Sequence, residues 1–294
     1  MSKISRSGFV GIIGAPNAGK STLLNQVLGQ KISITSKKPQ TTRDRILGVV
    51  NRPHSQIIFL DTPGIHKSTT LLNQRIVDQA VQAMSDVDLI LFMVDAASRN
   101  YASEKMIVKQ LEAVRKPVIL ALNKIDLTKK AAVYEQVEMF RQMYPFESII
   151  PVSARKNIQV DLLLDEVESR LPQGPPLYPE ETFTDISEKY MVSEIIREKV
   201  FRLTGMEIPY SSAVTVDAFE VEKKLIVIHA SIHLVRNSQK GIVIGKNGSM
   251  LKRIGSNARK DIEQMLGSKV LLKLFVKVTR DWISNKRHLS EFGY

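Results

Sequence analysis

An octapeptide near the amino terminus constrains the fold more than any other feature of this chain. It reads Gly14-Ala15-Pro16-Asn17-Ala18-Gly19-Lys20-Ser21 and has the spacing of a phosphate-binding P-loop. The apolar run 9–13 precedes it, and a helical pattern begins at Thr22, which predicts a strand that feeds a helix. Backbone N–H groups and the positive helix end would then point at one phosphate. The Lys20 ammonium would reach the β- and γ-phosphates, and the Ser21 hydroxyl would bind Mg²⁺.

Short apolar runs alternate with helical patterns from residue 8 to about residue 171. The runs cover residues 9–13, 57–60, 89–94, 118–122 and 149–152. This alternation predicts strands joined by crossover helices, which is an α/β doubly wound, mostly parallel sheet. Such sheets bind their ligand outside the carboxyl ends of the strands, and each motif of the first region lies at such an end.

The tetrapeptide Asp61-Thr62-Pro63-Gly64 follows the second of these runs and supplies a carboxylate beside the expected phosphates. Asp61 can hold Mg²⁺ through the water shell of the metal, and the Gly64 N–H can sense a γ-phosphate. The same pattern also occurs in ordinary turns, but its position 41 residues after Lys20 favours the nucleotide site. The expected nucleotide contacts here are Asp61, Thr62, Pro63, Gly64 and Ile65.

The tetrapeptide Asn123-Lys124-Ile125-Asp126 closes the run 118–122 and indicates which base is bound. The Asp126 carboxylate can accept hydrogen bonds from the N1–H and the exocyclic amine of guanine, whereas adenine has no donors at these positions. An unpaired buried charge costs about 1–3 kcal/mol or more, which favours GTP over ATP. The tripeptide Ser153-Ala154-Arg155, after the next strand, can add a backbone N–H to the guanine O6.

A polar segment between the P-loop and Asp61 is expected to become ordered when GTP binds. It contains Gln40, Thr41, Thr42, Arg43 and Asp44. A threonine here would complete the Mg²⁺ shell when a γ-phosphate is present, and we favour Thr42 over Thr41. An ordinary surface loop is the alternative. The expected catalytic residues are Lys20, Thr42 and Gly64, and the expected metal ligands are Ser21, Thr42 and Asp61.

The positive charge of the chain is concentrated towards its carboxyl end. The net charge is +12, and residues 229–294 contain 13 Lys or Arg against 4 Asp or Glu. This balance suggests a polyanionic partner, with nucleic acid ahead of an anionic membrane surface, and a solvated face is the alternative. The absence of cysteine excludes disulfides and fits a reducing cytosol. Without a signal-peptide core or an apolar run of about 18 residues, we expect a cytoplasmic protein.

Four prolines within residues 172–179 separate two regions of different character, because they disfavour helix and sheet alike. We therefore expect a nucleotide-binding domain over 1–171, a linker over 172–184 and a second, smaller α+β domain over 185–294. The patterns of the second domain predict a helix over 187–203, strands over 213–221 and 225–232, a basic helix over 249–266 and a last strand over 270–278.

The turn Gly245-Lys246-Asn247-Gly248 precedes the basic helix and resembles the KH module, in which such a turn holds about four unpaired nucleotides. The glycines permit close approach of phosphate, Lys246 adds charge, and the following helix adds its dipole. A structural turn is the alternative, because the same spacing occurs at Gly11 and Gly14 within a predicted strand. The expected RNA contacts are Ile244, Gly245, Lys246, Asn247, Gly248, Lys252 and Arg253.

With five motifs in order, the chain resembles the translation-factor-type GTPases, and its P-loop and Gln40-Thr41-Thr42-Arg43 forms resemble their Era-like bacterial branch. A GTPase domain joined through a proline-rich linker to a type II KH domain is the layout of that branch, so the resemblance covers nearly the whole chain. It implies binding of single-stranded small-subunit (16S) ribosomal RNA near its 3′ end during ribosome assembly. It also implies some peripheral membrane association and a potassium ion bound with help from Asn17. We further expect a monomer without a permanent protein partner.

One position departs from the Ras pattern. Ile65 stands where Ras-like enzymes have the glutamine that orients the attacking water, and isoleucine cannot form that hydrogen bond. Catalysis would then rest on Mg²⁺, Lys20 and the loop backbone, so we expect intrinsic hydrolysis below about one turnover per minute.

Two other functions remain open at this point. An ATP-driven RNA remodeller or kinase would share the P-loop, but the guanine-reading motif at Asn123 to Asp126 counts against it. A membrane-surface GTPase would use the basic carboxyl-terminal region to dock on anionic lipid and keep the Gly-x-x-Gly turn for structure alone. Competition between ATP and GTP, and binding to RNA against lipid, would distinguish these alternatives.

Overall fold

The computed structural model describes residues 6–35, 45–65, 81–82, 84–98, 100–205, 208–223, 225–285, 288–289 and 292. The predicted switch residues Gln40 to Asp44 therefore lie outside the described residues. The chain divides into two compact units. Among the described residues, the first unit runs to Ser33 and continues from Arg45 to Asp185, and the second comprises Ile34, Thr35 and the chain from Ile186 onward. Each unit has a hydrophobic core of its own.

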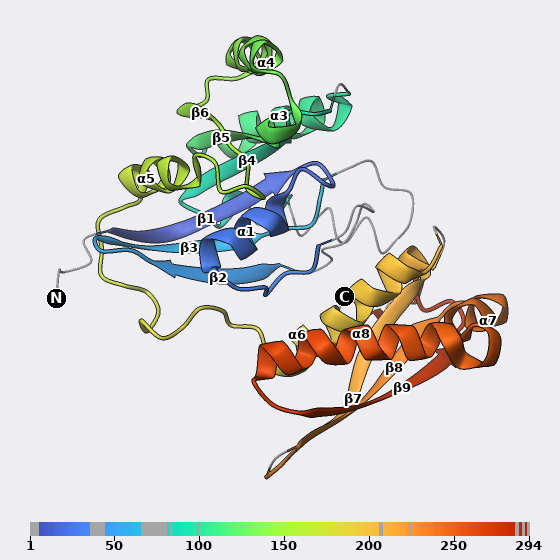
Figure 1. Ribbon diagram of the computed structural model, residues 1–294. Helices are drawn as coiled ribbons and strands as arrows, with labels where there is room; N and C mark the ends of the chain where they lie inside the picture. Colours follow the sequence, from blue (N-terminus) through green and yellow to red (C-terminus); the bar gives the residue numbers. More distant parts are fainter. Residues whose placement is uncertain are drawn as a thin grey trace. The chain divides into compact units, whose positions relative to one another are not determined.

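The first unit is built on a six-stranded sheet with the order β2-β3-β1-β4-β5-β6 (Figure 1). All neighbouring pairs are parallel except β2 and β3, which are antiparallel. The strands are β1 (Arg6–Gly14), β2 (Ile46–Asn51), β3 (Ser55–Asp61), β4 (Leu89–Asp95), β5 (Val118–Asn123) and β6 (Ser148–Pro151). Because helices cover both faces of such a sheet, its central strands are apolar throughout, which is why β5 is buried along its whole length. The predicted α/β class is confirmed.

Crossover helices place the polar strand ends at one edge of this sheet. Helices with described bounds are α1 (Lys20–Leu28), α3 (Ala102–Val114), α4 (Lys130–Met143) and α5 (Val160–Arg170). Right-handed crossovers put α1 on one face of the sheet and α3 and α4 on the other, because the strand order reverses next to β1 (Figure 1). The first unit therefore collects its motifs at the carboxyl ends of β1, β3 and β5, at the point where the strand order changes direction.

The proline-rich residues after α5 are bonded to strands β2 and β3 of the first sheet. The side chain of Gln56, which is fully buried on β3, accepts the N–H groups of Leu177 and Tyr178 at 2.7 and 2.8 Å and donates to the Tyr178 carbonyl. Further along, the Val49 N–H donates to the Phe183 carbonyl at 3.0 Å. The segment is thus held along much of its length and belongs with the first unit as far as Asp185.

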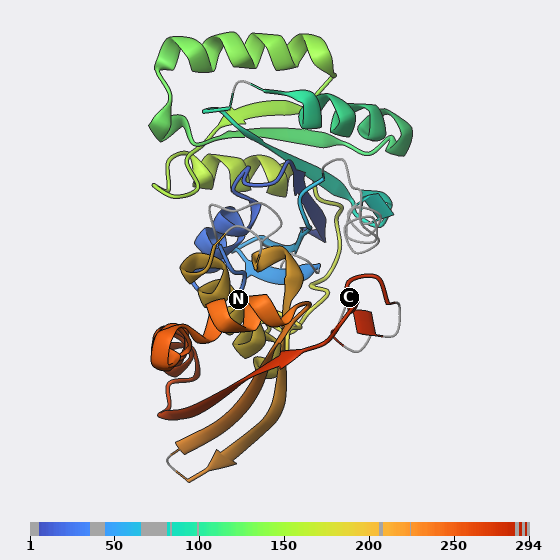
Figure 2. The same cartoon turned by 90° about the vertical axis from the view of Figure 1, so that its right-hand side faces the viewer.

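In the described part of the second unit, three α-helices pack on one face of a three-stranded sheet. Its elements are α6 (Glu188–Leu203), β7 (Ser212–Glu222), β8 (Leu225–Leu234), α7 (Asn237–Ile244), α8 (Ser249–Leu266) and β9 (Val270–Val278). The sheet order is β7-β8-β9, with β7 and β8 antiparallel and β8 and β9 parallel (Figure 2). Alternate residues of β8, such as Ile228 and Ile232, are fully buried against Ile196 of α6 and Ile254 of α8. The predicted order of a helix, two strands, a basic helix and a last strand is confirmed, and α7 is an additional helix between β8 and α8.

Within the described part of the chain, we find no helix that combines the length and the apolar character needed to cross a membrane.

Candidate functional site

The P-loop follows β1 in a conformation that only glycine permits at two positions. Gly14 and Gly19 have positive φ angles of 154° and 101°. A Cβ atom on Gly14 would lie 2.3 Å from the Met93 carbonyl oxygen, and one on Gly19 would lie 2.1 Å from Nδ2 of Asn123. Both distances are too short for any side chain, so the glycines of the motif are required by the close packing of the loop against β4 and β5.

Lys20, the first residue of α1, carries a buried ammonium group. Its Nζ donates to the carbonyl oxygens of Gly14 and Ala15, both at 3.1 Å, and the residue is 6% exposed. Burial lowers the pKa of Lys20 to about 8, although nearby Asp61 acts in the opposite direction. A buried ammonium group at the amino terminus of a helix can bind an anion, because the free N–H groups of the first turn also favour negative charge. This position of Lys20 therefore suits phosphate.

Asp61 ends β3 with a carboxylate that is fully buried. Its Oδ2 accepts a hydrogen bond from the Ser33 hydroxyl at 3.1 Å, whereas its Oδ1 has no hydrogen-bond partner among the described residues. Burial raises the pKa of Asp61 to about 6, and Lys20, Ser21 and Ser33 oppose that rise. A buried carboxylate oxygen without a donor, close to the Ser21 hydroxyl, matches the oxygen ligands that Mg²⁺ takes directly or through water. The residues present therefore fit the metal.

The end of the site that would hold the base is organised by Asn123, the last residue of β5. Its Nδ2 donates to the Ala18 carbonyl at 2.8 Å, and its Oδ1 accepts from the Ala154 N–H at 3.0 Å. The side chain therefore connects the P-loop to the loop after β6. Close by, the Ser153 hydroxyl donates to Oδ1 of Asp126 at 2.6 Å, which orients that carboxylate. The structure thus brings together the motifs that the sequence separates by more than 100 residues.

The structure also describes the surroundings of three further predicted nucleotide contacts, which are Thr62, Gly64 and Ile65. The Thr62 hydroxyl donates to the Ile12 carbonyl at 2.9 Å, and a Cβ on Gly64 would meet Pro16 at 2.8 Å. The side chain of Ile65 is fully buried in the first core, and its N–H donates to the Gly14 carbonyl at 3.2 Å. That side chain therefore faces the core.

Sequence reasoning missed Ser33 and Asp95. Ser33 is fully buried and bonds Asp61, but no motif surrounds it, so its role is visible only in the fold. Asp95 ends β4 and pairs with the Lys124 ammonium at 2.5 Å. Asp95 could have been found from the sequence, because it follows the apolar run 89–94 at the same sheet edge as the other motifs.

In the second unit, the predicted Gly-x-x-Gly turn connects α7 to α8. Gly245, Asn247 and Gly248 all have positive φ angles, of 72°, 51° and 75°. A Cβ on Gly245 would meet Met250 at 2.8 Å, whereas Gly248 has open space around it. The turn leads directly into the amino terminus of an 18-residue helix. The exposed basic side chains on and after it are Lys246, Lys252, Arg253, Arg259 and Lys260, which makes the turn and α8 suitable for phosphate groups.

Family models match both units. Residues 9–124 match the family described as 50S ribosome-binding GTPase, and residues 207–283 match the KH domain family.

Full-length relatives and solved structures resemble the whole chain. The chain is 51% identical to GTPase Era of Geobacter metallireducens over 291 residues, covering 98% of both chains. It is 46% identical to GTPase Era of Heliobacterium modesticaldum over 290 residues, covering 98% of this chain and 97% of the relative. An Era variant from Aquifex aeolicus bound to GDP and AlF4⁻ superposes with a TM-score of 0.94 at 40% identity, covering 98% of this chain and 99% of that chain. A complex of Era with MgGDPNP and nucleotides 1506–1542 of 16S ribosomal RNA superposes with a TM-score of 0.95 at 40% identity, covering 99% of each.

Proposed function

The chain belongs to the Era family of GTPases, and on that premise we propose that it binds single-stranded 16S ribosomal RNA through its second unit, under control of the nucleotide in its first. The family assignment also decides between GTP hydrolysis and the ATP-driven alternative, in favour of GTP. Assistance to assembly of the small ribosomal subunit follows from the same proposal. Nothing in the comparisons favours the membrane-docking alternative.

The observation that carries the RNA proposal is the left-handed Gly-x-x-Gly turn at the start of basic helix α8. Only glycine or a residue such as Asn adopts these φ angles without strain, and open space next to Gly248 leaves room for an RNA backbone. The Era complex that contains 16S ribosomal RNA supports the choice of ligand. The proposed contacts are the seven predicted from the sequence, from Ile244 to Gly248 together with Lys252 and Arg253.

The nucleotide site is proposed to use the residues that meet at the carboxyl ends of the strands, together with Thr42, which lies outside the described residues. Lys20 and the P-loop backbone would bind the phosphates, Ser21, Asp61 and Thr42 would hold Mg²⁺, and Asp126 would accept from guanine. When bound, Mg²⁺ neutralises charge on the β- and γ-phosphate oxygens. The solved Era structures with GDP and with MgGDPNP support this assignment. Because Ile65 faces the core, the attacking water must be placed by another group, so intrinsic hydrolysis is expected to be slow.

Several finer points belong to the same proposal. We place the domain limits at 1–171, 172–184 and 185–294. We also place the protein in the cytoplasm, as a monomer that contacts the membrane only peripherally. A potassium ion is proposed beside Asn17, which is exposed and has a positive φ of 65°. Equal rates of GTP hydrolysis in sodium and potassium buffers would contradict the potassium site.

The test of the RNA proposal compares Gly248→Asp with Gly248→Asn. Both residues tolerate a positive φ and have nearly the same shape, so their difference isolates the effect of a negative charge next to phosphate. Binding of a fluorescent single-stranded RNA with the 3′-end sequence of 16S ribosomal RNA is measured by anisotropy. We expect Asp to weaken binding at least tenfold, Asn to weaken it much less, and GTP hydrolysis without RNA to remain unchanged in both. Wild-type affinity in the Asp variant would exclude the turn as the RNA site.

Two further measurements define the interaction. If five or six basic residues neutralise phosphates, the slope of log affinity against log salt should be about −3.5 to −4. The dissociation constant should also differ between the GTP-analogue and GDP forms, because nucleotide control is a coupling free energy between two sites. Equal constants in the two forms would leave RNA binding intact and remove the switch.

A further inference from the structure

The chain leaves the nucleotide site through a short, firmly held segment. Asn25 on α1 accepts the N–H groups of Ile32 and Ser33 at 3.0 and 2.9 Å and donates to the Ser33 carbonyl at 2.7 Å. These bonds fix the Ser33 backbone, and its hydroxyl then donates to Oδ2 of Asp61 at 3.1 Å. The Ser33 hydroxyl is thus one of the groups that orient the carboxylate at the metal site.

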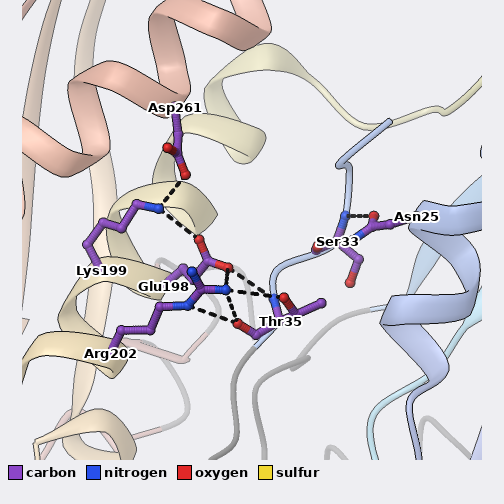
Figure 3. Close-up of polar contacts among 7 residues, drawn as sticks. All are labelled: Asn25, Ser33, Thr35, Glu198, Lys199, Arg202 and Asp261. Atoms are coloured by element: carbon purple, nitrogen blue, oxygen red, sulfur yellow. Dashed lines mark hydrogen bonds and ion pairs between the residues drawn. The ribbon is translucent and has the colours of Figure 1, made fainter. Parts of the chain in front are cut away.

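The next two residues, Ile34 and Thr35, belong to the second unit, and the Thr35 backbone is bonded to α6 within that unit (Figure 3). The Thr35 N–H donates to Oε1 of Glu198 at 3.3 Å. The Thr35 carbonyl accepts from Nη2 and Nε of Arg202 at 2.9 and 3.3 Å, and its hydroxyl oxygen lies 3.3 Å from the same Nη2. Both polar groups of the Thr35 backbone are therefore bound by adjacent turns of α6.

Glu198 gives this contact its strength, because its carboxylate is fully buried. It pairs with Arg202 at 2.8 Å and with Lys199 at 3.1 Å, and Lys199 also pairs with Asp261 of α8 (Figure 3). A buried carboxylate is stable only when its oxygens receive enough donors. The Thr35 N–H is one of those donors, so displacement of Thr35 would weaken the solvation of Glu198 as well as its own hydrogen bonds.

We propose that Glu198 and Arg202 are positioning residues for the GTPase site, which act through Thr35 and Ser33 on the Asp61 carboxylate that receives Mg²⁺. Covalent connection from Ser33 to Thr35 carries the effect, and no group of α6 has to reach the nucleotide. Holding Thr35 keeps the Ser33 hydroxyl directed at Asp61 and the carboxylate oriented for the metal. We call the hydrogen bonds of the Thr35 backbone to Glu198 and Arg202 the clasp. Loss of the clasp should therefore weaken retention of magnesium-bound nucleotide.

The first test uses Arg202→Ala and the rate at which a fluorescent GDP analogue dissociates from the full-length protein. Arg202 is suitable because its side chain is 47% exposed, so its removal leaves no large cavity. We expect dissociation to become about threefold to tenfold faster with Mg²⁺ and to stay unchanged in EDTA, because the effect passes through the metal ligand. Arg202→Lys, which can still donate to the Thr35 carbonyl, should recover part of the difference.

Lys189→Ala is the matched control, since Lys189 is another exposed cation on α6 and bonds neither Thr35 nor Glu198 in the described structure. It should leave the dissociation rate unchanged under both conditions. An equal increase with Mg²⁺ and with EDTA in Arg202→Ala would show that Arg202 acts on the fold in general, and no increase at all would show that the clasp does not act on the site. Either result overturns the proposal.

Hydrogen exchange gives a second readout without nucleotide or metal. In Arg202→Ala, peptides that cover residues 32–35 should exchange faster than in the wild type and in Lys189→Ala, because the Thr35 amide loses part of its support. Unchanged exchange in these peptides would contradict the clasp directly. Neither measurement requires RNA, so failure of the RNA proposal and failure of this one are distinguishable.

Discussion

Replacement of Asn123 by Ala should destabilise the first unit severely. The side chain is 2% exposed and makes two buried hydrogen bonds, to the Ala18 carbonyl at 2.8 Å and from the Ala154 N–H at 3.0 Å. Alanine leaves both backbone groups buried without a partner, at a cost of about 1–3 kcal/mol each. The expected loss in the free energy of unfolding is therefore about 2–6 kcal/mol, a large part of the 5–15 kcal/mol typical of a domain.

The assay must report on the two units separately, because a chain with two units need not unfold in one step. The only tryptophan, Trp282, is fully buried in the second unit, so its fluorescence follows that unit alone. Hydrogen exchange of peptides from β5 follows the first unit and yields its opening free energy. We expect Asn123→Ala to lower the opening free energy of the first unit. The unfolding transition of the second unit, followed by the fluorescence of Trp282, should stay unchanged.

One further variant divides the effect of Asn123 into its parts, and a second variant serves as a control. Asn123→Asp keeps an oxygen that accepts from the Ala154 N–H but loses the donor to the Ala18 carbonyl, so it should retain part of the stability. The exposed Asn257 on α8 is the control, and Asn257→Ala should change stability by about 0.5 kcal/mol or less. A change of that small size in Asn123→Ala would refute the reasoning that its two bonds hold the site together.

Three other changes test the site and its surroundings. Burial sets the pKa of Lys20 at about 8, and bound phosphate favours the charged form of its ammonium group. GDP affinity without Mg²⁺ should therefore fall about tenfold from pH 7 to pH 9, and titration calorimetry should show proton uptake on binding near pH 8. A GDP affinity that does not change with pH would mean that Lys20 is not buried as described. Asp126→Asn should weaken GTP binding at least tenfold and improve binding of xanthosine triphosphate, and calorimetry showing undiminished GTP affinity without that gain would remove the base assignment. Gln56→Ala should leave the N–H groups of Leu177 and Tyr178 without their acceptor and speed proteolysis of the segment after α5, whereas unchanged cleavage would show that the segment is held by other contacts.

The sequence predicted the fold class and the organisation of the motifs because these depend on local patterns. Apolar runs such as 118–122 are long enough and regular enough to identify buried parallel strands, and the motifs at Lys20, Asp61 and Asp126 follow such runs directly. The Gly-x-x-Gly turn was also visible, because a basic helical pattern follows it. The functional roles of these residues stay predictions until the variants are measured.

Other features arise only when distant segments meet. The proline content of residues 172–179 predicted a linker, but the hydrogen bonds that its N–H groups donate to Gln56 of β3 leave no pattern in the sequence. Asn123 belonged to a recognised motif, yet its two partners lie 105 and 31 residues away. A periodic pattern records which side of a strand or helix is buried, and it carries no information about such single, long-range bonds.

The amino-acid sequence by itself determined that this chain builds a doubly wound sheet with a phosphate-binding loop and a second, basic α+β unit, because strand and helix periodicity and glycine conformations are local properties. Only the tertiary structure decided that Ser33 orients Asp61 and that Thr35 is bound by Glu198 and Arg202. These contacts depend on how a buried carboxylate finds its donors, and the donors come from whatever segments the fold brings within hydrogen-bond distance.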